Sequence, residues 1–394
     1  MKNNFQLSAF NAQLPKGWEV KRLGEVCEIL DNLRKPITKR DRVDGDYPYY
    51  GATGILSYIN DYIFNEKLVL IGEDGAKWFS GANSSFIVKG KYWVNNHAHV
   101  IRPNRSIVLD KWIVYFLNFS DLTEFVTGMT VPKLNQGNLK QIKIPLPSLS
   151  TQKYIVTILD KAFAEIAKAE TIAKTNLQNA KELFESYLDN VFKNKSDDWE
   201  EKTLGEVCVK AESVNPKLNP KKKFVYIDVS SVNKETKIIE KITILLGKDM
   251  PSRARKLIKT NDIIFATVRP THQRITLIPN KYNNQVCSTG YYVFRPKNIL
   301  NSSIIYYFLL TCDFNKEMER LQKGASYPAV TNKEVESQTI FFPRSLEKQK
   351  KIVQKLNQLQ VKSKKLEAIY RQKILNLEEL KKSILQKAFS GRLL

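Results

Sequence analysis

Several residue types that carry chemistry are scarce in this chain of 394 residues. Its four cysteines show no CxxC spacing, so neither a zinc site nor redox chemistry is indicated. Cys27 and Cys208 stand in apolar, strand-like stretches, and we expect both to be buried. Two of the three histidines, His97 and His99, would point to one face of a strand. No third ligand accompanies them, so no metal site is expected.

Motifs for catalysis and for membrane insertion are also missing. There is no GxxxxGK[ST] loop, Gly-rich cofactor loop, Asn/Asp-Pro-Pro-aromatic motif, carboxylate pair or nucleophile elbow. We therefore expect a non-catalytic chain that binds no cofactor itself. No apolar run reaches the length of a membrane span, and Met1–Phe5 lack the apolar core of a signal peptide. These absences predict a cytoplasmic protein without a membrane partner.

Acidic residues are too few to balance the basic ones. The chain carries 63 Lys and Arg against 40 Asp and Glu, a net charge of +23, with a pI near 9.6. Residues 347–394 alone hold 13 basic and 4 acidic side chains. With 42% apolar residues the chain can fold, so the charge indicates a globular protein with polyanionic partners or acidic protein neighbours.

The sequence contains an internal repeat. The segment Trp18–Cys27 returns as Trp199–Cys208, with Leu-Gly-Glu-Val-Cys identical in both copies. Other features recur in the same order: Arg102-Pro103 as Arg295-Pro296, Gly128 and Pro132 as Gly324 and Pro328, and a helical pattern at 152–192 as one at 349–389. A period this long indicates a duplicated domain with pseudo-twofold symmetry.

The two helical patterns predict long paired helices. Apolar positions follow steps of three and four from Ile155 to Val191 and from Ile352 to Ala388, with an extra step of four at the same place in each. No Pro or Gly interrupts either pattern, so each helix should run for about 40 residues, or roughly 60 Å. The helix ends carry more apolar residues than one seam needs, and we interpret the surplus as a docking patch for a partner protein. This patch comprises Phe184, Tyr187, Leu188, Phe192, Ile384, Leu385 and Phe389.

Between the helices, both modules show short β-type runs and one helix-like stretch, typical of mixed α/β domains. Their middles, 44–100 and 225–290, look unrelated, which fits two readers of different targets. Basic, amide and aromatic side chains gather there and in the turns around Gly128 and Gly324, and such side chains contact phosphates and base edges. The candidate DNA-binding residues are Tyr49, Tyr50, Lys77, Trp78, Asn96, His97, Lys133, Asn135, Arg269, Thr271, Gln273, Arg274, Lys323 and Tyr327.

These features, taken in order, resemble the specificity subunit of type I restriction-modification systems over nearly the full chain. The resemblance is carried by Leu14-Pro15-Lys16-Gly17-Trp18, by Pro145-Leu146-Pro147 before Gln152, by the repeated helices, and by the ending Ala388–Leu393. The second module departs from the pattern because it begins at Asp197-Asp198-Trp199 without a Pro-Lys-Gly-Trp sequence. This departure makes the start of its first strand uncertain.

The resemblance implies an α+β architecture of two mixed α/β target-recognition domains, separated by two long antiparallel coiled-coil helices in a pseudo-twofold repeat. We predict a first recognition domain at 1–150, a central spacer helix at 151–195, a second recognition domain at 196–346 and a distal spacer helix at 347–394. Each domain would read one half of a bipartite site in double-stranded DNA.

The spacer would set the gap between the half-sites and dock two methyltransferase subunits, which would carry the restriction motor subunits. S-adenosylmethionine, ATP and magnesium would act on those partners. A free-standing bivalent DNA-binding regulator and a fragment of a fused methyltransferase-nuclease remain as alternatives.

Overall fold

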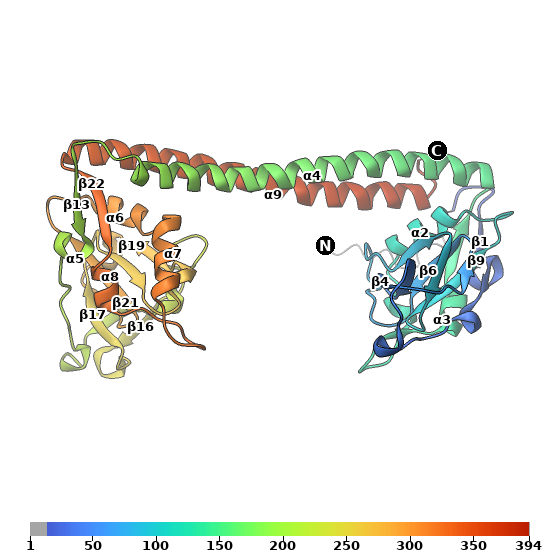
Figure 1. The fold of residues 1–394 in the computed structure, drawn as a ribbon, viewed down its shortest axis with the longest axis horizontal. Helices are drawn as coiled ribbons and strands as arrows, with labels where there is room; N and C mark the ends of the chain where they lie inside the picture. Colours follow the sequence, from blue (N-terminus) through green and yellow to red (C-terminus); the bar gives the residue numbers. More distant parts are fainter. Residues whose placement is uncertain (1–13, 394) are drawn as a thin grey trace. The chain divides into compact units, whose positions relative to one another are not determined.

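The computed structural model describes residues 14–393, which divide into two compact units. The first unit combines the chain up to Lys174 with the residues from Gln372 onward, and the second is Thr175–Arg371. Each holds one mixed α/β domain together with parts of two long helices, α4 (Leu149–Lys193) and α9 (Leu346–Phe389) (Figure 1). The predicted fold class is confirmed. The residues Met1–Phe5 lie outside the described part.

The long helices are continuous because no Pro or Gly interrupts 149–193 or 346–389. In the first unit, Lys381 of α9 lies over the ring of Phe163 in α4, with its ammonium 5.3 Å from the ring centre. In the second unit, Ser363 of α9 donates a hydrogen bond to the carbonyl of Ala180 in α4, at 2.5 Å. From the first contact to the second, the residue number rises from 163 to 180 in α4 and falls from 381 to 363 in α9. The helices therefore pair antiparallel. None of the described helices is both long and apolar enough to span a membrane.

Within 14–174, the first domain forms two four-stranded sheets. The antiparallel sheet has the order β2 (Cys27–Ile29), β9 (Ala98–Pro103), β6 (Leu68–Gly72), β7 (Ser85–Val88). The other sheet has the order β4 (Gly54–Ile59), β3 (Tyr47–Gly51), β8 (Lys91–Val94), β5 (Phe64–Asn65), with β3 and β8 parallel. Two strand pairs, β1 (Glu19–Arg22) with β12 (Lys143–Leu146) and β10 (Val126–Thr127) with β11 (Lys133–Leu134), and three helices, α1 (Leu23–Val26), α2 (Asp110–Phe119) and α3 (Gln136–Gln141), complete the domain.

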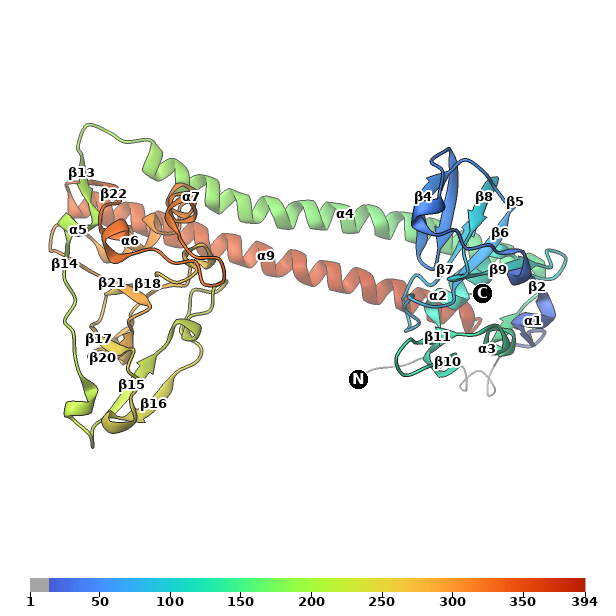
Figure 2. The same ribbon diagram turned by 60° about the horizontal axis from the view of Figure 1, so that its bottom comes forward.

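The second domain, within 196–346, repeats the strand order of both four-stranded sheets. Its antiparallel sheet has the order β14 (Cys208–Val209), β21 (Tyr291–Pro296), β18 (Ile263–Ala266), β19 (Ile275–Leu277). Its other sheet has the order β16 (Thr243–Leu246), β15 (Lys223–Ile227), β20 (Gln285–Ser288), β17 (Ala254–Ile258), with β15 and β20 parallel (Figure 2). Completing it are the strand pair β13 (Trp199–Thr203) and β22 (Thr339–Pro343), and the helices α5 (Leu204–Val207), α6 (Ser302–Phe308), α7 (Cys312–Leu321) and α8 (Asn332–Glu336). The dissimilar middles thus share one strand order.

A buried glutamine joins each domain to the first turns of its long helix. The side chain of Gln152 accepts from the backbone N–H of Leu109 and donates to the carbonyls of Ile107 and Pro147. Gln349 repeats all three bonds with Asn301, Ile299 and Pro343. Both glutamines are fully buried. An apolar side chain at either position would leave three buried backbone groups without hydrogen bonds, so glutamine stabilises the domain more than an apolar residue would.

The predicted docking patch at the helix ends is corrected for four of its seven residues, because their side chains complete the cores of the chain's own domains. Phe389 of α9 packs on Trp112 and Phe116 of α2, with ring centres 4.8 and 5.2 Å apart, and Leu385 is buried in the same core. Leu188 and Phe192 of α4 are likewise buried in the second domain. The remaining members, Phe184, Tyr187 and Ile384, are partly buried against these cores.

The prediction that Cys27 and Cys208 are buried is confirmed. Both thiols lie inside the apolar cores, and burial raises the pKa of each to about 12. They therefore stay protonated and serve as small apolar side chains.

Candidate nucleic-acid interface

Each domain brings two loops together at the end of its central strand. In the first domain, the segment 73–84 after β6 meets the segment 127–135, since Leu134 donates its N–H to the carbonyl of Glu73 at 2.8 Å. In the second, the segment 267–274 after β18 meets 323–330, because Val330 donates to the carbonyl of Thr267 at 3.0 Å. We call these the first and the second loop pair. The equivalent bridges Asp74 to Lys133 and Val268 to Ala329 align them residue for residue.

Glycine shapes both outer loops. Gly128 and Gly324 have φ values of +97° and +106°, a region that side chains with a Cβ rarely adopt. A Cβ on Gly128 would lie 2.4 Å from the carbonyl oxygen of Val131, and one on Gly324 would lie 3.3 Å from that of Tyr327. The repeated spacing of Gly and Pro in the sequence therefore encodes the same exposed turn in both domains.

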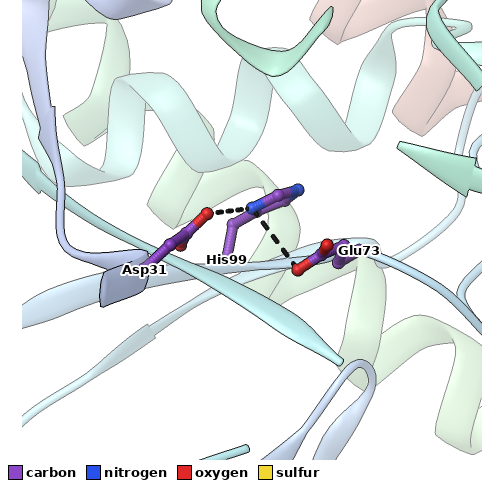
Figure 3. Close-up of side chains that lie close together, drawn as sticks. All are labelled: Asp31, Glu73 and His99. Carbon is purple, nitrogen blue, oxygen red and sulfur yellow. Dashed lines mark hydrogen bonds and ion pairs between the residues drawn. The ribbon is translucent and has the colours of Figure 1, made fainter. Parts of the chain in front are cut away.

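A buried group of charged residues anchors the first loop pair (Figure 3). The Nδ1 atom of His99 lies 2.6 Å from Asp31 Oδ2 and 3.8 Å from Glu73 Oε2. Its Nε2 atom lies 2.7 Å from the carbonyl oxygen of Leu134 in the outer loop. Both ring nitrogens thus face oxygen acceptors.

Two cations neutralise the carboxylates of Asp31 and Glu73. Arg34 pairs with Glu73 and with Asp31, and Lys133 lies 2.8 Å from Glu73. Burial by itself raises the pKa of Asp31, but the hydrogen bond from His99 and nearby positive charges outweigh it, so the pKa is lowered. Burial of Glu73 is likewise outweighed by its bonds from Lys133 and Arg34, which lower its pKa. The network therefore holds charged carboxylates in the native state.

Asp31, Glu73 and His99 have the composition of a metal site, with one possible ligand atom from each lying within 4.8 Å of the others. The fit is poor, because Arg34 and Lys133 already supply positive charge at these oxygens and His99 uses both nitrogens. His97 does not join the group: its ring binds Asp74 instead, at 2.5 Å. The expectation that the two histidines share one face is wrong, because His97 precedes strand β9.

Main-chain bonds and an unusual backbone hold the second loop pair. Arg269 donates its N–H to the carbonyl of Pro328 at 2.6 Å. Arg269 and Gln273 flank the short 3₁₀ turn η8 (Pro270–His272), and both adopt the left-handed conformation, with φ values of 50° and 47°. The ammonium of Lys237 donates to the carbonyl of Gln273 at 2.7 Å, which ties the turn to a neighbouring loop.

The surroundings of the second loop pair are positively charged. Burial, and after it the charges of Lys234, Arg269 and Arg274, lower the pKa of His272. A cluster of cations that disfavours a further positive charge also attracts an anion such as phosphate. This electrostatic character fits the polyanionic partner predicted from the composition.

Half of the predicted DNA-binding residues have exposed side chains, and all of these lie in the loop pairs or in the turns next to them. These are Lys77, Asn96, His97 and Lys133 in the first domain, and Arg269, Lys323 and Tyr327 in the second. Lys133 combines exposure with its ion pair to Glu73. Contact of these seven residues with DNA stays a prediction.

Two predicted residues are corrected because their side chains lie in the core. Tyr49 is buried and its hydroxyl accepts from the backbone N–H of Ile37, at 3.0 Å. Trp78 is also buried and donates to the carbonyl of Gly72, at 3.1 Å. A base cannot reach either ring without unpacking the domain.

The other predicted residues are partly buried, and most have structural contacts. Tyr50 packs against Phe86 and Tyr92, and Asn135 caps helix α3 by accepting from the N–H of Asn138. Arg274 donates to the carbonyl of Val232, while Gln273 contributes its own carbonyl to Lys237. Thr271 lies inside the turn η8. Any role of these residues at DNA would come in addition to a structural one.

Sequence reasoning missed the residues that position the loops. Asp31 and Arg34 lie in one segment, and Glu73 lies about 40 residues further along the chain. The sequence offers one signal for these residues, an acidic pair directly after the apolar run 68–72. Lys237 carried no signal, because its role depends on the fold of the loop that it reaches.

A family model described as the type I restriction modification DNA specificity domain matches residues 15–176 and again 196–377. A Haemophilus influenzae protein, provisionally named as a type I restriction enzyme specificity subunit, is 39% identical over 162 residues, which is 41% of either chain. The type I restriction enzyme MjaVIII specificity subunit of Methanocaldococcus jannaschii is 24% identical over 97% of this chain and 94% of its own.

A solved structure shares the fold. A chain from a study of complex assembly in a type I restriction-modification system covers 96% of this chain and 98% of its own length, with a TM-score of 0.71 at 19% identity. The family match spans both domains and most of both long helices. This chain therefore belongs to the family of type I restriction-modification DNA specificity subunits.

Proposed function

We propose that this chain reads a bipartite site in double-stranded DNA, with one half-site contacted by each loop pair, and that it performs no chemistry itself. The observation that carries the proposal is one fold used twice, with exposed basic, amide and aromatic side chains that differ between equivalent loops. Such side chains contact phosphates and base edges. Different residues on one frame suit two different half-sites.

The charge of the chain supports a DNA partner. Lys and Arg exceed Asp and Glu by 23, and the second loop pair lies among cations. Binding should weaken as salt rises, with a log-log slope of about −0.9 for each phosphate neutralised. A flat salt response would oppose DNA as the main partner.

We further propose that α4 and α9 set the gap between the half-sites and dock two methyltransferase subunits, which would carry the restriction motor subunits. S-adenosylmethionine, ATP and magnesium would then act on those partners. Exposed apolar side chains on the helices support a protein partner there. They include Ile172 and Leu183 of α4, and Val361, Ile369, Leu375 and Leu380 of α9.

Exchange of one domain tests the reading of half-sites. Residues 15–150 are replaced by the matching domain of a relative with a different target, and the methylated motif of host DNA is sequenced. Half of the motif should change and the other half should persist. Exchange of 196–345 is the matched control and should change the opposite half. A change in both halves after a single exchange would refute independent reading.

Lengthening the helices tests the gap. A complete heptad inserted near Ala173 and near Tyr370 keeps the apolar seam in register and adds about 10 Å to each helix. The motif should keep both halves and widen its gap by a few base pairs. An active protein with an unchanged gap would mean that the helices only carry partners.

A further inference from the structure

We propose that Arg269, stacked on Tyr327, reads a guanine in the second half-site. The inference rests on the proposed function and deepens it, because it names a specificity-determining residue and the base that it recognises.

The fold requires a left-handed residue at the position of Arg269. This position lies three residues after the end of β18, and the equivalent position after β6 is Gly75. The flanking bonds align the two, since Glu73 and Thr267 accept equivalent backbone N–H groups and Asp74 and Val268 form equivalent bridges. Gly75 has a φ of +67° and Arg269 a φ of 50°. The first domain thus fills the position with the residue that adopts this conformation without strain.

Arginine at this position raises the conformational free energy of the backbone. A left-handed conformation strains any residue with a Cβ, and the following residue, Pro270, further restricts Arg269. A strained residue where glycine would serve points to a role for its side chain. The neighbouring backbone holds the conformation in place, with the N–H of Arg269 bound to the carbonyl of Pro328.

The side chain of Arg269 is exposed and makes two contacts within the second loop pair. The guanidinium carbon lies 4.9 Å from the ring centre of Tyr327, which is 72% exposed. One terminal nitrogen donates to the carbonyl of Ser326 at 3.1 Å. Among the described residues, no other hydrogen bond or ion pair of this guanidinium is found. These two contacts restrain the guanidinium and leave N–H donors available to a ligand.

A planar pair of N–H donors matches the O6 and N7 acceptors of guanine in the major groove. A phosphate can also accept two N–H bonds from an arginine. Every nucleotide carries a phosphate, whereas the bases differ between half-sites. A strained arginine at only one of the two equivalent positions therefore favours the base over the phosphate. The equivalent Gly75 offers no such contact, so the first domain must read its half-site differently.

The test uses the complex of this chain with its methyltransferase subunits, and its methylated motif provides the reference site. Binding is measured to DNA in which each base pair of the second half-site is varied. We expect one guanine to be preferred by about 5- to 150-fold over other bases in the wild-type complex. R269G should abolish that preference, leave the first half-site unchanged and keep or raise the melting temperature, because glycine relieves the strain. R269K should retain the charge but lose most of the preference.

Several outcomes would overturn the inference. One is full guanine preference in both R269G and R269K, and another is a second half-site without guanine. Uniformly weaker binding to all sequences by R269G, with R269K unaffected, would assign a phosphate contact instead. A wild-type complex with no sequence preference would refute the proposed function itself, which separates that failure from failure of this inference.

Discussion

The two domains share a frame but anchor their loops differently. Equivalent main-chain bonds, from Leu134 to Glu73 and from Val330 to Thr267, join the loops in both. The first domain adds a buried network of charged side chains around Glu73, whereas the second adds a strained backbone at Arg269 and Gln273. The shared strand order and main-chain bonds thus keep the loops in equivalent places, while the side chains of the loops can differ between the domains. This freedom is what a pair of readers with different targets needs.

The largest expected loss of stability comes from replacing Glu73, the centre of the ionic network that holds the first loop pair. Replacing Glu73 with Gln removes the buried charge that neutralises Arg34 and Lys133, and should destabilise the first domain by about 3–5 kcal/mol. The matched change Thr267→Val removes one hydroxyl bond to Gly290 and should cost the second domain about 1 kcal/mol. Hydrogen exchange read separately at 126–135 and 323–330 measures both. Equal losses in the two domains would contradict the distinction.

The buried glutamines test what the domains share. Gln152→Ala and Gln349→Ala each leave three backbone groups unpaired, so each should destabilise its own domain by about 2–4 kcal/mol. Thermal unfolding with domain-resolved hydrogen exchange measures the two losses. Lys153→Ala, at an exposed position beside Gln152, is the control and should change little. If only one of the two variants lost stability, the two glutamines would not have equivalent roles in their domains.

Features carried by local pattern could be predicted from the sequence. The apolar seams predicted both long helices, and the spacing of Gly128 with Pro132 and of Gly324 with Pro328 predicted matching turns. The common topology of 44–100 and 225–290 could not be predicted. Strand pairing depends on long-range register, and many different apolar sequences satisfy the same sheet.

The candidate site was predictable only in part. Exposed residues such as Arg269 and Lys133 were identified by residue type, but Tyr49 and Trp78 have the same composition signal and lie in the core. The helix ends failed for a related reason. An apolar residue such as Phe389 suits a docking surface or a core equally, and only the fold decides which it joins.

Acid should weaken the first loop pair selectively. The lowered pKa values of Asp31 and Glu73 mean that their stabilising contribution is complete above the ordinary values of 3.8 and 4.5. It is lost as the pH falls through the lowered native values. Hydrogen exchange at 126–135, corrected for intrinsic rates, should therefore lose protection on acidification before that at 323–330. Earlier loss at 323–330 would contradict the assignment of the ionic anchor.

The smallest expected effects concern the left-handed positions. Gly75→Ala should destabilise the first domain by about 1 kcal/mol, because alanine is strained at that φ although the space beside it is open. Gln273→Gly should stabilise the second domain by up to about 1 kcal/mol, because glycine relieves the strain. Melting temperatures measured side by side test this opposition of sign. Two changes of the same sign would show that backbone strain does not distinguish the loops.

Sequencing of methylated bases, in a host that carries this chain with its partner subunits, shows whether two separate domains read the DNA. We expect a motif of two specified half-sites, separated by a gap of roughly 5–8 unread base pairs, that disappears when this chain's gene is deleted. One continuous motif without a gap, or a motif that persists without this chain, would contradict the reading of DNA by two separate domains.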